Sequence, residues 1–140
     1  MKIGKYSVLL ACVAIAAAVL ACSSLSTTTT PAVSNIRMTT DETGKTPTSS
    51  YSPNAPFYVF ADLSGLAKGS VVQAKWFAVS AEGVDPNSEI NTSQYTYEEG
   101  VSYVYFQLTT SDGGDWPTGS YRVDLYLDGS KVGEQGFTVQ

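Results

Sequence analysis

The sequence predicts an all-β fold, in which two antiparallel sheets pack face to face as a β-sandwich of about seven strands. Three observations lead to this prediction. After residue 22, apolar and polar residues alternate with a period of two, and no stretch shows helical spacing. The alternating stretches are short, and Gly, Pro, Ser, Thr and Asp residues separate them. A chain of 140 residues also has room for only one modest core once an N-terminal leader is removed.

The first residues have the pattern of a secretory signal. Lys2 and Lys5 precede an apolar run over residues 8–21, which is too short to span a bilayer but suits a signal peptide. The run ends in Val-Leu-Ala-Cys, which resembles the lipobox of bacterial lipoproteins. The resemblance implies that residues 1–21 are cleaved as a signal peptide and that Cys22 receives the lipid, such as palmitate. The alternatives are an ordinary cleaved signal and an uncleaved anchor.

Residues 22–32 form the predicted tether between the lipid and the domain. The stretch Ser-Ser-Leu-Ser-Thr-Thr-Thr-Thr-Pro has no charge and no periodicity, so it has no means of burying a core. A lipidated Cys22 therefore predicts that the domain, residues 33–140, is held on a membrane. The sequence leaves open whether the envelope has one membrane or two, so we expect the outer membrane or the cell surface. It also leaves open whether the threonines of the tether carry glycans.

Three strands are expected in the first half of the domain. Residues 33–39 form an edge strand, and residues 40–54, rich in Thr, Ser and Pro, are mostly loop. Residues 57–65 form a second strand, in which residues of odd number share one face. Residues 71–80 form the third strand. Alanines flank Trp76 on its own face of this strand, and small neighbours leave room for a large ring between two sheets.

The second half begins with residues 81–93, which are polar and are expected to be loop. Residues 94–99 supply a short edge strand, and residues 101–110 form a clear strand. In this last strand Val104, Phe106 and Leu108 point inward, and the intervening residues point outward.

Residues 115–140 predict a closing hairpin. Residues 121–127 alternate strictly, and Asp128 and Gly129 are two residues that tolerate positive φ in a tight turn. On the return strand Phe137 and Val139 share a face but Val132 does not. A β-bulge is therefore expected near Gly133 or Gly136.

Several of these residues resemble those of an immunoglobulin-like domain over residues 33–140. Trp76 stands where such domains place the buried Trp of their third strand, and Tyr121, which follows Pro117 and Gly119, resembles the tyrosine corner. Val123 stands at the position of the second family cysteine, and Ala61 or Val59 would face it. The resemblance implies that packing of apolar side chains replaces the family disulfide.

Composition excludes most catalytic and metal chemistry for the domain. The chain has no histidine, and its only cysteines are Cys12 and Cys22, so the domain contains no disulfide, no Cys or His nucleophile and no Cys/His zinc site. Residues 111–115 contain two aspartates but no calcium-loop spacing, and are expected to be a polar turn. The net charge of −5 is spread along the chain, which argues against nucleic acid as a partner. We expect no enzymatic activity, no cofactor and no metal.

Outward-facing aromatic residues are the candidate binding surface. The period of two places five of them away from the core: Tyr58, Phe60, Tyr103, Tyr105 and Tyr126. Such rings can anchor a protein interface or stack on sugars, and they are also common as purely structural cross-strand pairs. An immunoglobulin-like arrangement implies that Tyr126 lies in the sheet opposite Tyr103 and Tyr105.

The function that follows is a non-catalytic, membrane-anchored lipoprotein that binds another envelope protein or stabilises an envelope assembly. Its membrane contact is the lipid on Cys22, and its protein partner is not identified by the sequence. The alternative is a module that binds a glycan or small ligand on the tyrosine face.

Overall fold

A computed structural model describes residues 29–140. The signal peptide (residues 1–21), the lipidation site Cys22 and most of the tether lie outside the described residues, so they remain predictions. Within residues 29–140, no helix is long and apolar enough to cross a membrane.

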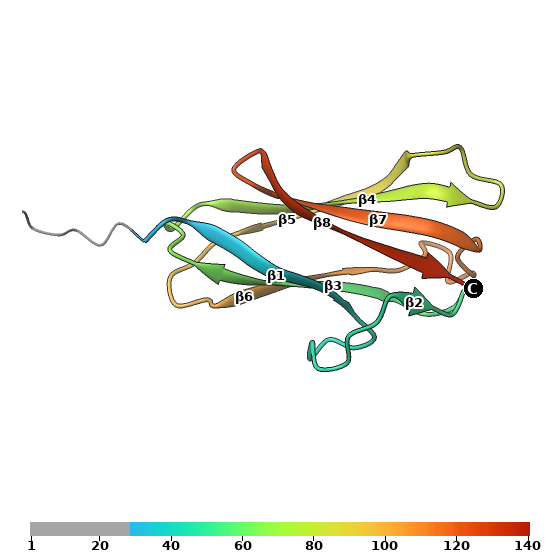
Figure 1. The fold of residues 1–140 in the computed structure, drawn as a ribbon, viewed down its shortest axis with the longest axis horizontal. Coiled ribbons are helices and arrows are strands. Elements are labelled where there is room, and N and C mark those ends of the chain that lie inside the picture. Colours follow the sequence, from blue (N-terminus) through green and yellow to red (C-terminus); the bar gives the residue numbers. More distant parts are fainter. Residues whose placement is uncertain (1–28) are drawn as a thin grey trace, which may run out of the picture.

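The described chain forms two sheets that pack as two layers (Figure 1). The three-stranded sheet has the order β1 (Ala32–Thr39), β3 (Phe57–Ser64) and β6 (Tyr103–Leu108). The five-stranded sheet has the order β2 (Ser50–Tyr51), β8 (Ser130–Val139), β7 (Gly119–Leu127), β4 (Val71–Ala81) and β5 (Ser88–Thr96). All pairings are antiparallel except the short β2–β8 pairing, which is parallel. The prediction of an antiparallel β-sandwich is confirmed.

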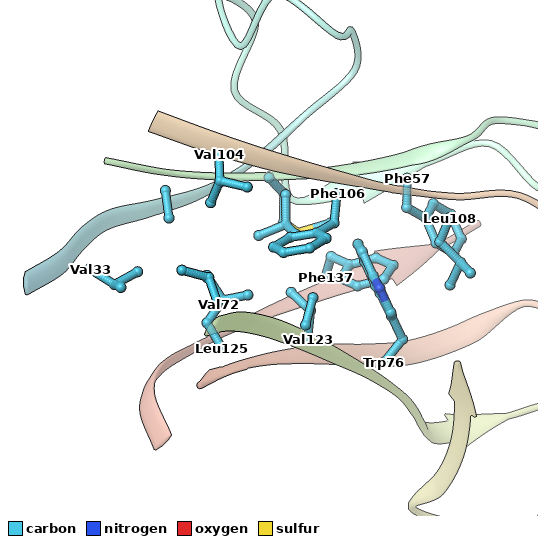
Figure 2. Packing of buried hydrophobic residues seen from close by; sticks show 14 of the residues in the cluster. Val33, Phe57, Val72, Trp76, Val104, Phe106, Leu108, Val123, Leu125 and Phe137 are labelled. Carbon is cyan, nitrogen blue, oxygen red and sulfur yellow. The ribbon is translucent and has the colours of Figure 1, made fainter. Parts of the chain in front are cut away.

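The core lies between the two sheets and is centred on aromatic residues (Figure 2). Trp76 and Phe57 are both 0% exposed. The ring of Phe137 lies edge-on to both of them, with centroid distances of 6.2 Å to Trp76 and 4.7 Å to Phe57. The expected small neighbours of Trp76, Ala74 and Ala78, are buried on the same face of β4.

Tyr121 has the geometry of a tyrosine corner. Its hydroxyl donates a hydrogen bond to the carbonyl oxygen of Pro117 at 2.6 Å, and its ring stacks on Phe137 at 5.5 Å. Burial raises the pKa of this hydroxyl. The hydrogen bond therefore holds the chain that enters β7 against the core, as the immunoglobulin-like resemblance implied.

The β7–β8 hairpin confirms the predicted turn and bulge. Asp128 and Gly129 have φ values of 47° and 85°, so both central residues occupy the left-handed region that this tight turn requires. Leu125 pairs with Gly133 while Tyr126 pairs with Lys131, which leaves Val132 as the extra residue of the bulge. The turn is also tied to β4, because the backbone N–H of Val71 donates to Asp128 at 2.7 Å.

The sequence pattern missed β2, and it predicted an edge strand over residues 94–99 where β5 spans Ser88–Thr96. Residues 40–54, expected to be mostly loop, contain β2, where buried Tyr51 donates to the carbonyl oxygen of Thr39 at 2.6 Å. Burial raises the pKa of Tyr51 to about 12. Residues 81–93, also expected to be loop, contain the start of β5 at Ser88. Strand β5 has few apolar residues, and a bulge interrupts its alternation of half-buried and exposed side chains, so its first half was not recognised as strand.

Candidate binding surface

The five candidate residues do not form one surface. Tyr58 and Phe60 on β3 and Tyr103 and Tyr105 on β6 share the outer face of the three-stranded sheet, because Phe60 pairs with Tyr105 and the others lie two residues away. Tyr126 is on β7 in the five-stranded sheet. It therefore contributes nothing to the surface around Tyr103 and Tyr105.

Tyr58 and Phe60 are not accessible, which corrects the expectation that they belong to a binding surface. They are 9% and 2% exposed. The loop after β1 covers Phe60 so closely that a Cβ on Gly44 would lie 2.8 Å from its ring. The guanidinium of Arg37 lies 5.4 Å from the centroid of the same ring. The expected orientation away from the core is therefore right, but the loop covers the ring of Phe60, and Tyr58 contacts Gln107 and Tyr105 of β6.

Tyr103 and Tyr105 are the exposed part of this face. They are 53% and 41% exposed, and Val132 is the only other large hydrophobic residue with comparable exposure among residues 29–140. Both tyrosine rings stack on Phe60, with centroid distances of 6.1 Å for Tyr103 and 5.1 Å for Tyr105. Buried Phe60 thus fixes the two exposed rings in place, which lowers the entropy lost when a partner contacts them.

Two open hollows adjoin Tyr103. The first has a volume of about 430 Å³ and is lined by residues of β5, β6 and the segment before β6: Tyr95, Val101, Ser102, Tyr103, Val104 and Tyr105. The second has a volume of about 390 Å³ and lies toward β1, with Arg37, Phe60 and Asp62 in its wall. Tyr103 and Ser102 line both hollows, so the two hollows meet at the start of β6.

The charged groups of the second hollow already have partners. Asp62 accepts hydrogen bonds from Asn35 Nδ2 at 2.8 Å and from Arg37 Nη1 at 3.2 Å. The hydrogen bond from Asn35, followed by the contacts with Arg37, lowers the pKa of Asp62. An ionised carboxylate held in this way is a poor general base.

Tyr126 belongs to a separate set of contacts on the outer face of the five-stranded sheet. The ammonium of Lys75 lies 5.1 Å from its ring centroid. Nearby, Asp124 is 3% exposed and forms ion pairs with Arg122 at 2.7 Å and Lys131 at 3.2 Å. The alternating pattern placed Asp124 outward, but it gave no sign of this buried ion pair. The contacts of Lys75 and Lys131 join β7 to β4 and β8, and Tyr126 itself is half-buried.

No group of three or more His, Cys, Asp or Glu residues within residues 29–140 is arranged to hold a metal ion. In the turn over residues 111–115, Asp112 accepts the backbone N–H of Gly114 at 3.0 Å. Thr110 donates to the carbonyl oxygen of the same glycine at 2.8 Å. The polar groups of this turn therefore form hydrogen bonds with one another.

Comparison with known proteins identifies the fold and no family. No protein-family model matches the chain, and a search of the curated proteins finds no significant match. Among solved structures, an immunoglobulin-like protein from Pseudomonas aeruginosa is 13% identical with a TM-score of 0.55, and the match covers 76% of this chain and 93% of that one.

Two further solved structures share the fold with a small part of their length. The alkylpurine DNA glycosylase AlkC of Pseudomonas fluorescens is 11% identical with a TM-score of 0.52, and a β-glucosidase of Listeria innocua is 14% identical with a TM-score of 0.50. The matches cover 79% and 78% of this chain but only 30% and 16% of those chains. At such identities they show an immunoglobulin-like β-sandwich and nothing about activity.

Proposed function

We propose that this protein is a non-catalytic lipoprotein of the bacterial envelope whose immunoglobulin-like domain binds another protein. The observation that supports this most is the pair of exposed, pre-positioned tyrosines, Tyr103 and Tyr105, beside two hollows. Tyrosine is enriched among the residues that dominate protein interfaces, and rings held rigid before binding favour association.

The arrangement of the chain suits a tethered binding domain. Strand β1 begins at one end of the sandwich, and the C-terminus lies at the opposite end (Figure 1). A lipid on Cys22, followed by the tether of residues 22–32, would hold the first end toward the outer membrane or the cell surface. The sheets would then extend away from the membrane. The outer face of the three-stranded sheet would point sideways and remain accessible to a partner.

Replacing Cys22 by alanine is expected to abolish lipid attachment. The chain should then incorporate no labelled palmitate in growing cells and should keep its signal peptide, because lipoprotein-type processing depends on Cys22. Cys12→Ala is the matched control and should leave both properties unchanged. Palmitate labelling that persists in the Cys22→Ala chain would show that the lipobox interpretation is wrong.

The double substitution Tyr103→Ser and Tyr105→Ser tests the binding surface. We expect the melting temperature to fall slightly, since each lost cross-strand contact is worth ~0.2–1 kcal/mol. Affinity for the co-purifying envelope protein should fall by more than ~2 kcal/mol if these rings anchor the interface. The measurements are thermal denaturation and a quantitative pull-down from detergent-solubilised membranes, with Tyr126→Ser as the control. Unchanged binding by the double variant would remove this face from the proposal.

Binding of a glycan is the second candidate, because Arg37 and Asp62 line a hollow beside an aromatic ring. The geometry favours it less than protein binding. Each tyrosine already has one ring face stacked on Phe60, which reduces the flat surface open to a sugar. Quenching of intrinsic fluorescence by peptidoglycan fragments would favour the glycan, and a stoichiometric protein complex would favour the first proposal.

A further inference from the structure

Strand β6 has one side of its backbone without a partner. It pairs only with β3, and the backbone N–H of Leu63 donates to the carbonyl oxygen of Ser102 at 2.8 Å. Hydrogen-bonded and non-hydrogen-bonded positions alternate along an antiparallel pair, so Val104, Phe106 and Leu108 direct their backbone groups at β3. The N–H and C=O groups at the intervening positions, 103, 105 and 107, point to the free edge. No backbone hydrogen bond within residues 29–140 takes them up.

The other sheet edges of the described chain are interrupted. Strand β1 has a register shift between Ser34 and Arg37, where Asn35 has a φ of 50°. Strand β5 has a bulge opposite the step from Trp76 to Phe77, and β2 has only 2 residues. Bulges and short strands are devices that prevent unwanted pairing at an edge.

Strand β6 has none of these devices. Its sequence, Tyr-Val-Tyr-Phe-Gln-Leu, contains no charge and no proline, and all six residues pair with β3 without a register shift. An uncharged, regular strand with a free edge is a template for an additional strand. The other sheet edges of the described chain are protected against pairing and this one is not. The contrast indicates that the free edge of β6 serves to bind a partner.

A hollow lies along this free edge. The 430 Å³ hollow is lined by Tyr95 of β5, by Val101 and by the first residues of β6, so it opens at the side of the sandwich between the two sheets. A strand added to β6 would place alternate side chains toward this hollow. In strand addition, backbone hydrogen bonds supply affinity and such pockets select the side chain. The walls of Tyr95, Val101 and Val104 fit an apolar side chain.

Charge near the ends of β6 favours a basic partner. Glu98 and Glu99 precede the strand, and Asp112 and Asp115 follow it. Glu98 is paired with Lys68 at 3.2 Å, whereas Glu99 and Asp115 form no ion pair within residues 29–140. A second copy of this chain fits less well. Antiparallel pairing of two β6 strands about Tyr105 would bring Glu98 of one copy to Asp112 of the other.

We propose that the free edge of β6 receives an extended segment of a partner protein as an additional strand, with an apolar side chain in the adjoining hollow and Lys or Arg residues at its ends. This inference rests on the proposed protein-binding function and specifies its mode. It predicts that recognition depends on backbone groups of β6 as well as on the two tyrosine rings.

A pair of variants at one position separates backbone from side chain. Tyr105→Pro removes the ring and the outward N–H, whereas Tyr105→Thr removes the ring and keeps the N–H. The N–H at 105 forms no bond to β3, and proline is tolerated on edge strands, so both variants should fold. Circular dichroism checks this. If Tyr105→Pro does not fold, Tyr103→Pro and Tyr103→Ser provide the same comparison.

The probe is a library of random short peptides, selected on the full lipidated chain in detergent. We expect enrichment of peptides that alternate apolar residues with Thr, Ser or other polar residues and carry Lys or Arg at the ends. Fluorescence anisotropy with the synthesised peptides should show binding weakened about tenfold more by Tyr105→Pro than by Tyr105→Thr, as the loss of one backbone hydrogen bond requires. Failure to enrich such peptides, or equal binding to the two variants, would overturn strand addition.

The envelope partner distinguishes this inference from the function on which it rests. If the partner recovered by pull-down binds Tyr105→Pro and Tyr105→Thr equally, the protein-binding function stands and strand addition is wrong. If neither a partner nor any peptide binds the wild-type chain, both proposals are wrong.

Discussion

Replacing Trp76 by alanine is expected to lower the free energy of unfolding by ~3–5 kcal/mol. The indole is 0% exposed and packs edge-on against Phe137 at 6.2 Å, in the middle of the core between the sheets. Its loss leaves a cavity that the surrounding β-strands fill only partly, since strands held by ladders on both sides move little. A domain of this size has a total stability of about 5–15 kcal/mol, so the variant should be near the limit of folding.

Trp76→Phe is the matched control for this experiment. The indole Nε1 of Trp76 is buried without a hydrogen-bond partner among the described residues, so phenylalanine removes volume but no hydrogen bond. It should therefore cost much less than alanine. Urea denaturation followed by circular dichroism measures both variants without relying on tryptophan fluorescence. An unchanged midpoint for Trp76→Ala would contradict a central role for the ring in the core.

The strands that the sequence predicts best are those with one buried and one outer face. Strand β6 alternates between exposed and buried residues along its whole length, and β4 alternates over most of its length, so period-two patterning identifies them directly. Strand β5 lies at an edge, where one row of side chains is only half-buried, and a bulge shifts the alternation, so the sequence pattern is weak there. Strand β2 is too short to have one, and its place depends on Tyr51 reaching the core.

The sequence predicts which way the candidate aromatic side chains point, but it does not predict how exposed they are. The period of two alone places four aromatic residues on the outer faces of their strands: Tyr58, Phe60, Tyr103 and Tyr105. It does not reveal that the loop containing Gly44 folds over β3 and leaves β6 uncovered, because that loop is irregular and its contacts are distant in sequence. The sequence also does not predict the free edge of β6, because that edge depends on which strands become neighbours in the sheet.

Replacing Gly119 by alanine is the second substitution for which we expect a large loss of stability. Gly119 has a φ of 149°, a backbone conformation that side chains rarely adopt, and it begins β7 where that strand pairs with Ala81 of β4. A Cβ at this position would lie 2.6 Å from the Cα of Ala81 and closer still to the carbonyl oxygen of Ser80. Backbone atoms of a paired strand have little freedom to move away.

Two costs should therefore add for Gly119→Ala. The unfavourable backbone conformation costs about 1–3 kcal/mol, and the displacement of β4 from β7 costs about 1–3 kcal/mol more. The displacement also threatens the hydrogen bond from Tyr121 to Pro117, which spans this glycine. Gly129→Ala is the control, because Gly129 has a φ of 85° but no atom within 4 Å of an added Cβ. It should incur the first cost alone, so urea denaturation should show a clearly smaller loss for Gly129→Ala than for Gly119→Ala; equal losses would mean that the close approach of β4 and β7 at Gly119 contributes nothing to the stability difference.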